Sequence, residues 1–263
     1  MKIKAIFFDI DGTLLSYRTH QVLPGTKEAL RQLRQKGILT FISSGRPKVL
    51  IPPMPVTFDG YITVNGGYCL AGDRVILRHP IDEADCRRWI EYVEERGMIT
   101  MCFTAEQMYI NRIDQKCLDL QRQLGFEMPP IMSLKELFDG HHPAEDREIY
   151  QFIAMQPADE DPKVLSMLSH CRMPRWHPDF TDIIPDGSSK AVGIEIILNH
   201  YGICSEEAMA FGDGANDIEM LEYVGIGVAM GNAADIVKQH ADIVTDDAES
   251  EGILHALERT GVL

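Results

Sequence analysis

The 263-residue sequence lacks the features that mark several large classes of protein. It has 25 lysine and arginine residues against 40 aspartate and glutamate residues, and this formal net charge of -15 argues against a surface for nucleic acid or anionic membrane. No apolar stretch approaches the length of a membrane span, and aspartates interrupt the first apolar run too early for a signal peptide. We expect no nucleic acid and no membrane among the partners, and a monomer or a weak homodimer.

Metal-binding and disulfide patterns are also missing from the six cysteines. None of them forms a Cys-x-x-Cys pair, so a zinc site is not expected. Several lie in apolar stretches, which is typical of small core residues. Free thiols persist in reducing compartments, and we therefore expect a cytoplasmic protein.

The two ends of the chain, residues 1–80 and 187–263, share one pattern. Short apolar runs typical of buried strands alternate there with amphipathic helices. The runs cover residues 5–10, 38–43, 61–64, 208–211, 226–230 and 241–245. This alternation predicts an α/β fold, with a Rossmann-like, doubly wound parallel sheet covered on both faces.

The middle of the chain, residues 81–186, follows a different pattern. A helix is predicted over 82–95, followed by a hairpin formed by residues 98–104 and 107–112. Further strands are expected at 148–155, 172–177 and 181–185, and further helices at 114–124 and 161–168. Paired strands with interspersed helices predict an inserted α+β domain with a mostly antiparallel sheet.

Acidic and small polar residues follow the predicted core strands. Asp9 and Asp11 end the first strand, and because side chains alternate along a strand, both can face one small volume. A second acidic cluster, residues 212–217, follows a late strand. Ligands bind beyond the carboxyl ends of strands in open parallel sheets. Carboxylates with glycines beside them predict a site for a hard divalent cation and a phosphate.

Four motifs in this order give the chain its family resemblance. They are Phe8-Asp9-Ile10-Asp11-Gly12-Thr13-Leu14, Ser44-Gly45-Arg46-Pro47, Lys190, and Gly212-Asp213-Gly214-Ala215-Asn216-Asp217. With them the chain resembles the haloacid dehalogenase-like superfamily, and within it the Cof-type sugar-phosphatase group with a large α/β cap. The insertion lies between the second and third motifs, where that group carries its cap, so residues 81–186 are expected to be the substrate-specificity domain.

The resemblance implies roles for the residues in these motifs. Asp9 is expected to be the nucleophile that forms an aspartyl-phosphate, and Asp11 the general acid and base. Lys190 is expected to hold Asp9 and the phosphoryl group, and Ser44 to donate to a phosphoryl oxygen. Mg²⁺ is expected on Asp9, the backbone carbonyl of Asp11, and Asp213.

Other residues are expected to contact the phosphate or the substrate, or to have a structural role. Gly45, Asn216 and Asp217 are expected near the phosphate, the last two also orienting Lys190 or metal-bound water. Asn65 is favoured as a phosphate or substrate contact, and Asp182 is the best candidate for a specificity residue in the cap. Arg46 could approach substrate or pair with a structural carboxylate.

Four further features are predicted to have no direct role in the chemistry. Asn232 and Trp176 are read as structural, and His141-His142 as an exposed loop because no third metal ligand has suitable spacing. The acidic run 246–251 is read as a solvated turn.

The prediction is a Mg²⁺-dependent phosphatase that hydrolyses small phosphorylated metabolites. The family resemblance makes hexose phosphates the first candidate substrates, and nucleoside, flavin or pyridoxal phosphates are alternatives. One alternative is a phosphomutase that passes the aspartyl-phosphate to a second sugar hydroxyl. Another is a non-catalytic sensor of a phosphorylated ligand.

Overall fold

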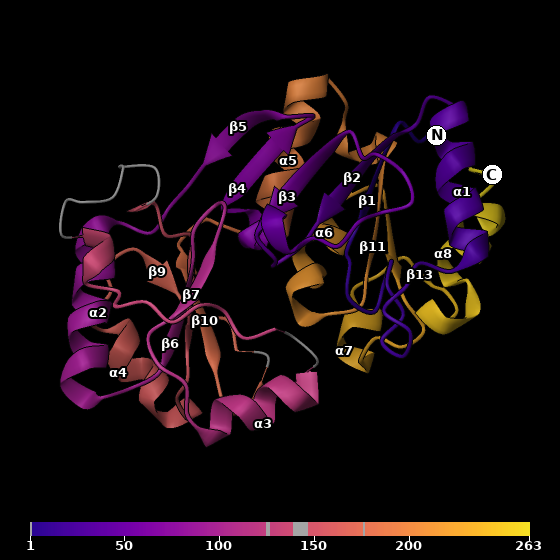
Figure 1. The fold of residues 1–263 in the computed structure, drawn as a ribbon. Helices are drawn as coiled ribbons and strands as arrows, with labels where there is room; N and C mark the ends of the chain where they lie inside the picture. Colours follow the sequence, from indigo (N-terminus) through magenta and orange to yellow (C-terminus); the bar gives the residue numbers. More distant parts are fainter. Residues whose placement is uncertain (1, 125–126, 139–146, 176) are drawn as a thin grey trace. The chain divides into compact units, whose positions relative to one another are not determined.

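A computed structural model describes residues 2–124, 127–138, 147–175 and 177–263 (Figure 1). The chain forms two compact units. Unit 1 comprises Met1–Arg46, Ile51–Arg78 and Ser188–Leu263, and unit 2 comprises Pro47–Leu50 and His79–Gly187.

Unit 1 is built on an eight-stranded sheet in the order β13-β12-β11-β1-β2-β3-β4-β5. The strands that pair in parallel are β1 (Ala5–Phe8), β2 (Leu39–Ser43), β3 (Gly60–Thr63), β11 (Ala208–Gly212), β12 (Ile226–Ala229) and β13 (Ile243–Val244). The predicted α/β class with a mainly parallel sheet is thereby confirmed. Two strands that the sequence analysis missed, β4 (Tyr68–Ala71) and β5 (Arg74–Arg78), extend one edge as an antiparallel hairpin.

The unit 1 sheet separates two apolar cores. Side chains alternate along β1, so Ile6 and Phe8 enter one core while Ala5 and Phe7 enter the other. Phe8 stacks on Phe211 with ring centroids 5.2 Å apart. Burying each such ring contributes roughly 1.5–3 kcal/mol, which fixes the strands that lead into the loops beyond them.

Helices cover both cores of unit 1 (Figure 1). The core around Phe8 is covered by α1 (Pro24–Gln35) and α8 (Gly252–Arg259), which lie side by side. The other core is covered by α5 (Lys190–Tyr201), α6 (Ile218–Tyr223) and the short α7 (Asp235–Lys238). Helices on both faces are the doubly wound arrangement that the alternating pattern predicts.

Unit 2 contains a five-stranded antiparallel sheet in the order β7-β6-β8-β10-β9. The strands are β6 (Thr100–Phe103), β7 (Met108–Ile110), β8 (Gln151–Ala154), β9 (Cys171–Arg172) and β10 (Thr181–Pro185). Its helices are α2 (Glu83–Arg96), α3 (Gln115–Leu124) and α4 (Asp161–Leu165). The predicted antiparallel sheet and its β6–β7 hairpin are present, whereas β9 and α4 are shorter than expected.

The core of unit 2 forms between α2 and the sheet. Asp82 starts α2 by accepting a hydrogen bond from the Ala84 amide, and Gly97 ends it in a left-handed conformation. Trp89 is fully buried and donates its indole N–H to Thr100 Oγ1 at 3.1 Å. The one polar atom of this large side chain is therefore satisfied inside the core.

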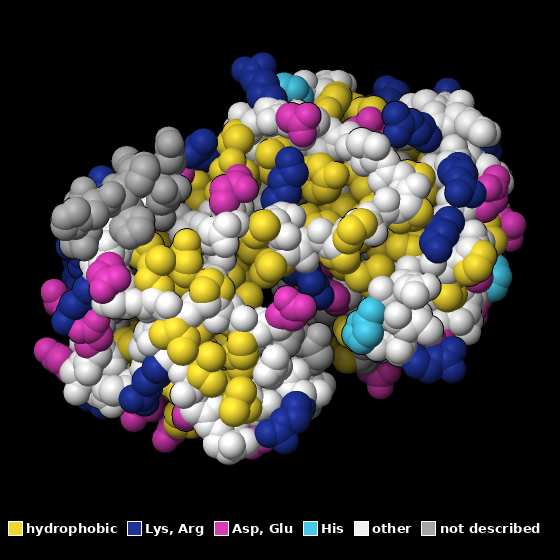
Figure 2. Space-filling view, viewed as in Figure 1, with side chains coloured by type: hydrophobic (Ala, Val, Ile, Leu, Met, Phe, Trp, Pro, Cys, Tyr) yellow, Lys and Arg dark blue, Asp and Glu magenta, His cyan; other side chains and the backbone are white. Residues whose placement is uncertain are grey.

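The surface carries charges of both signs. On the face shown in Figure 2, Lys and Arg side chains lie among Asp and Glu side chains. Five of the six cysteines are buried, Cys204 is exposed, and all six are free thiols. Within the described residues, every helix is too short or too polar to cross a membrane.

Candidate active site

Polar residues that the sequence placed at strand ends lie at the carboxyl edge of the unit 1 sheet. Asp9 directly follows β1, Ser44 follows β2 and Asp213 follows β11. These three strands are parallel neighbours, so their carboxyl ends meet. The sheet topology therefore brings together residues about 200 positions apart in the sequence, such as Thr13 and Asp213.

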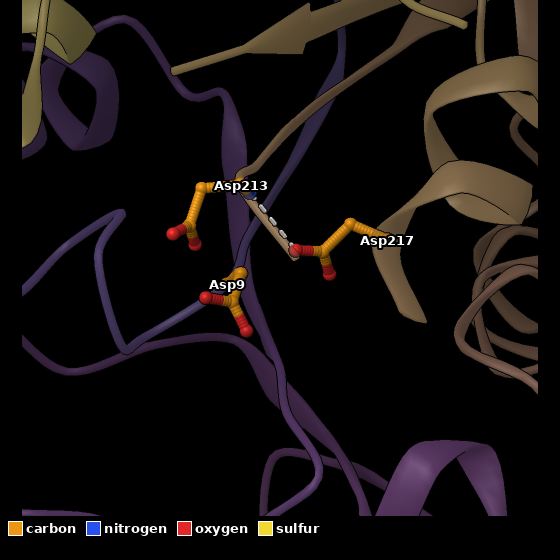
Figure 3. A group of neighbouring side chains, drawn as sticks. All are labelled: Asp9, Asp213 and Asp217. Carbon is orange, nitrogen blue, oxygen red and sulfur yellow. Dashed lines mark hydrogen bonds between the residues drawn. The ribbon is translucent and has the colours of Figure 1, made fainter. Parts of the chain in front are cut away.

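Three buried carboxylates converge at this edge. Asp9, Asp213 and Asp217 each offer an oxygen within 4.8 Å of the others (Figure 3). Lys190, the first residue of α5, is only 1% exposed, and its Nζ donates to Asp9 Oδ1 at 2.7 Å and also to Asp217 Oδ1. One ammonium thus faces three carboxylates, which leaves an excess of negative charge in a buried volume.

The pKa values of these groups reflect that excess. Burial raises the pKa of Asp9 well above its ordinary value, and Asp217 and Asp213 add to the shift although Lys190 opposes it. Burial and the charge of Asp217 raise the pKa of Asp213 to about 6. Burial alone would lower the pKa of Lys190, but Asp217 and Asp9 hold it above its ordinary value. Lys190 therefore stays charged, and the site favours any additional cation.

Asp217 organises the loop that carries Asp213. Its Oδ2 accepts hydrogen bonds from the backbone amides of Asp213 at 2.9 Å and Gly214 at 2.8 Å. Gly212 makes room for this arrangement, because a Cβ there would lie 2.5 Å from the Asp217 Cβ. With Oδ1 bound to Lys190, both oxygens of Asp217 are engaged. Asp217 is therefore better placed to position Lys190 and the loop than to bind a cation directly.

Three donors surround the Asp213 carboxylate. Thr13 Oγ1 donates to Oδ1 at 3.2 Å, while Tyr17 Oη and Asn232 Nδ2 donate to Oδ2 at 3.0 and 3.1 Å. The sequence analysis did not single out Thr13 or Tyr17. Thr13 belongs to the first motif and could have been found there, whereas no spacing rule marks Tyr17. Asn232, predicted to be structural, also donates to the backbone carbonyl of Gly12 at 2.9 Å.

Asp11 and Arg46 form a bidentate ion pair. Arg46 Nε donates to Oδ2 at 2.7 Å and Nη2 donates to Oδ1 at 2.8 Å. The sequence left Arg46 open between substrate and a structural carboxylate. In the structure it binds a carboxylate, and that carboxylate is the predicted acid–base residue. The two side chains are 40% and 41% exposed, so solvent or a ligand can reach the pair.

A second polar cluster contains Ser44, Gly45, Asn65 and Asn216. Asn216 Nδ2 donates to Asn65 Oδ1 at 3.0 Å. A Cβ on Gly45 would lie 3.2 Å from Asn65 Nδ2, so the glycine keeps space between them. The buried Ser44 hydroxyl accepts a hydrogen bond from the backbone amide of Arg46 at 3.1 Å and can still donate its proton.

The turn that carries Asn65 has an unusual backbone. Val64, Asn65 and Gly66 have φ angles of 44°, 53° and 88°. For the β-branched Val64 this left-handed conformation costs about 1–2 kcal/mol. A Cβ on Gly66 would lie 2.0 Å from the carbonyl oxygen of Ser189, so the turn packs directly against the residue before Lys190. The strained turn therefore links Asn65 to the start of α5.

Asp182, the predicted specificity residue, lies in unit 2. It is on β10, where it pairs with Ile153 of β8, and it is only 4% exposed. Its backbone amide donates to the carbonyl of Pro174 at 3.3 Å. Trp176 and His141-His142 lie outside the described residues.

The donor set at the carboxylate cluster fits a hard divalent cation. It consists of oxygen atoms, and hydrogen bonds from Thr13 and Asn232 hold Asp213 in place. Asp9 Oδ1 is bound to Lys190, and within the described residues no donor occupies Asp9 Oδ2. A cation bound by Asp9 and Asp213 would balance the excess negative charge that raises the pKa values of both residues.

The chain belongs to the haloacid dehalogenase-like hydrolase family, whose sequence profile matches residues 6–257. It is 31% identical over 271 residues to the "Putative phosphatase YkrA" of Bacillus subtilis, with all of both chains covered. The structure is similar to that of the subclass IIB sugar phosphatase BT4131, with a TM-score of 0.86 at 35% identity over 99% of this chain and 100% of the other. For the phosphatase BT1666 of Bacteroides thetaiotaomicron the TM-score is 0.90 at 34% identity, over 100% and 96%.

These similarities confirm the family and the class of enzyme that the four motifs predicted. The chain is a haloacid dehalogenase-like phosphatase with the α/β fold of that superfamily.

Proposed function

We propose that this enzyme is a Mg²⁺-dependent phosphomonoesterase that hydrolyses small phosphorylated metabolites through an aspartyl-phosphate on Asp9. The observation that carries the proposal is the buried cluster in which Lys190 binds Asp9 and Asp217. Asp213 lies close enough to Asp9 for one divalent cation to bind both carboxylates. Lys190 binds Asp9 Oδ1, and within the described residues no hydrogen bond engages Oδ2, the oxygen that would attack phosphorus.

In the first step, Asp9 Oδ2 attacks phosphorus in line with the leaving oxygen. A bond forms between Asp9 and phosphorus, the ester P–O bond breaks, and Asp11 gives its proton to the departing alcohol. Each oxygen of Asp11 accepts one hydrogen bond from Arg46 in this structure and keeps a second lone pair that can carry this proton.

In the second step, water attacks the phosphorus of the aspartyl-phosphate. Asp11, now a carboxylate, takes a proton from the water, the bond between Asp9 and phosphorus breaks, and free phosphate leaves. The Asp11 carboxylate then has the charge that pairs with Arg46 in this structure.

The remaining residues of the site position charge. Asp9, Asp213 and the backbone carbonyl of Asp11 would hold Mg²⁺, which offsets the repulsion between an anionic nucleophile and a phosphate dianion. The Ser44 hydroxyl, the Gly45 amide and the Lys190 ammonium are expected to bind phosphoryl oxygens. Phosphoryl transfer depends chiefly on such positioning and charge neutralisation.

We propose that unit 2 is the cap that selects the substrate. Unit 2 is inserted in the sequence between the second motif and Lys190, which supports this role. Hexose phosphates are the first candidates, because BT4131, at 35% identity over nearly the whole chain, is a sugar phosphatase. Within unit 2, Asp182 stays the proposed specificity residue.

Phosphate release from a panel of phosphate esters tests the proposal. The panel contains sugar phosphates, nucleotides and cofactor phosphates, each assayed with Mg²⁺ and with a chelator, for the wild type and Asp9→Asn. We expect metal-dependent release by the wild type alone, fastest with hexose phosphates. Transfer to a second sugar hydroxyl in place of release would identify a phosphomutase. Equal release by both proteins would show that Asp9 is not the nucleophile.

A further inference from the structure

The Asp213 carboxylate is held by two donors that come from different loops and reach the same oxygen. Tyr17 Oη lies 3.0 Å and Asn232 Nδ2 lies 3.1 Å from Oδ2, while Thr13 binds Oδ1. Together these bonds fix the rotation of the carboxylate about its own axis. The direction of its remaining lone pairs, which a cation would use, is therefore set by the surrounding side chains.

The Tyr17 ring is held against the backbone of the first motif. Gly12 has a φ of 83°, and a Cβ there would lie 2.3 Å from Tyr17 Cε2 and 2.3 Å from Asp213 Oδ2. Only glycine allows both groups to approach this backbone so closely. Although Tyr17 is 59% exposed, its hydroxyl is directed inward to Asp213 instead of to solvent.

The acidic run 246–251 supports both of these donors. Glu249 Oε1 accepts hydrogen bonds from the Ser16 hydroxyl and from the Arg18 amide, the residues on either side of Tyr17. The adjacent Ala248 amide donates to Asn232 Oδ1 at 2.9 Å, which directs the Asn232 Nδ2 toward Asp213. Asp246, Asp247 and Ser250 are exposed, as the predicted solvated turn requires, but Ala248 and Glu249 have partners that the prediction missed. The middle of the run anchors the two loops that meet at Asp213.

We propose that Tyr17 is a positioning residue for Asp213, and that Glu249 acts on the site by holding the Tyr17 loop. This inference rests on the proposed function, because it assigns Asp213 to a Mg²⁺ site. Removing an outer hydrogen-bond partner of a metal ligand typically weakens metal binding by about 10–100-fold. The Tyr17 hydroxyl is therefore expected to matter for metal affinity more than for folding.

Mg²⁺ binding to the metal-free protein tests the proposal without any substrate. The dissociation constant is measured by isothermal titration calorimetry for the wild type and Tyr17→Phe, with Tyr223→Phe as the matched control. Within the described residues, no hydrogen bond involves the Tyr223 hydroxyl. Tyr17→Phe should bind Mg²⁺ about 10–100-fold more weakly, and its melting temperature in chelator should fall by no more than the loss of one hydrogen bond to Asp213 explains. Tyr223→Phe should bind like the wild type.

A second variant tests whether Glu249 affects the metal site by holding the loop that carries Tyr17. Glu249→Ala should weaken Mg²⁺ binding less than Tyr17→Phe does, and the double variant should bind no more weakly than Tyr17→Phe alone. Equal affinities for wild type and Tyr17→Phe would overturn the role of Tyr17 and leave the proposed function standing. A lower melting temperature in chelator with unchanged affinity would assign Tyr17 to folding alone. A wild type that binds no Mg²⁺ would contradict both proposals.

Discussion

Replacing Lys190 by methionine should destabilise the metal-free protein strongly. Methionine is unbranched and of similar length, so it fills the volume while removing the one ammonium that faces Asp9, Asp213 and Asp217. Breaking a buried ion pair by removing one partner costs about 3–5 kcal/mol, because the remaining charges stay buried without compensation. Lys190 also begins α5, where a positive charge opposes the helix dipole by about 0.3–1 kcal/mol. Relief of the helix dipole offsets only part of this cost, so the net loss is about 2–5 kcal/mol.

Scanning calorimetry in chelator measures this loss. The melting temperature should fall by roughly 4–20 °C, whereas Lys2→Met at an exposed position should change it little. Fluorescence is unsuitable because both tryptophans, at positions 89 and 176, belong to the range of unit 2. Adding Asp217→Asn to Lys190→Met should restore part of the loss, because it removes one uncompensated charge. A loss below about 1 kcal/mol would refute the reasoning, since that is the effect of an exposed ion pair.

Two further predictions concern Asp213 and Glu251. In chelator, Asp213→Asn should be more stable than the wild type at pH 7.5, because a buried carboxyl with a pKa of about 6 is costly to ionise. The folded state of the wild type holds this proton more tightly than the unfolded state, so the advantage of the variant should disappear as the pH falls from above 6 to about 4. Its upper limit is about 3 kcal/mol, and calorimetry that finds the same difference at both ends of this range would contradict the assignment. Glu251 accepts hydrogen bonds from the amides of Gly25 at 2.6 Å and Thr26 at 2.7 Å, in the first turn of α1, where Leu23 provides no side-chain cap. Glu251→Ala should therefore cost about 1–2 kcal/mol in urea unfolding, and a neutral result would show that the contact does not stabilise the helix.

Local patterns were sufficient to predict most of the fold and the candidate site. Apolar runs and amphipathic helices identified the parallel sheet, and the strand-end rule placed Asp9, Ser44 and Asp213 at one edge. The hairpin of β4 and β5 was not predicted, although Gly72, with a φ of 57°, marks its turn.

Residues whose roles depend on distant partners could not be predicted in the same way. The sequence around Lys190 alone predicts a surface lysine at the start of a helix. Lys190 is nevertheless buried, because it forms an ion pair with Asp9, which lies 181 positions earlier. Arg46 could be assigned to an ion pair only when its partner, Asp11, was known. The acidic run was predicted to be solvated, because a run of charges does not reveal that Glu249 binds the loop at Ser16 and that Glu251 binds the first turn of α1 at Thr26.

The most direct test of the account is to trap the phosphoryl group on Asp9. An aryl phosphate has a leaving group that needs no acid, so Asp11→Asn should still form the aspartyl-phosphate but hydrolyse it slowly. Rapid acid quenching followed by peptide mass spectrometry should find the phosphoryl adduct on the peptide that contains Asp9, and Asp9→Asn/Asp11→Asn should carry none. Phosphate release by Asp11→Asn without any adduct, or an adduct on another residue, would contradict the central claim.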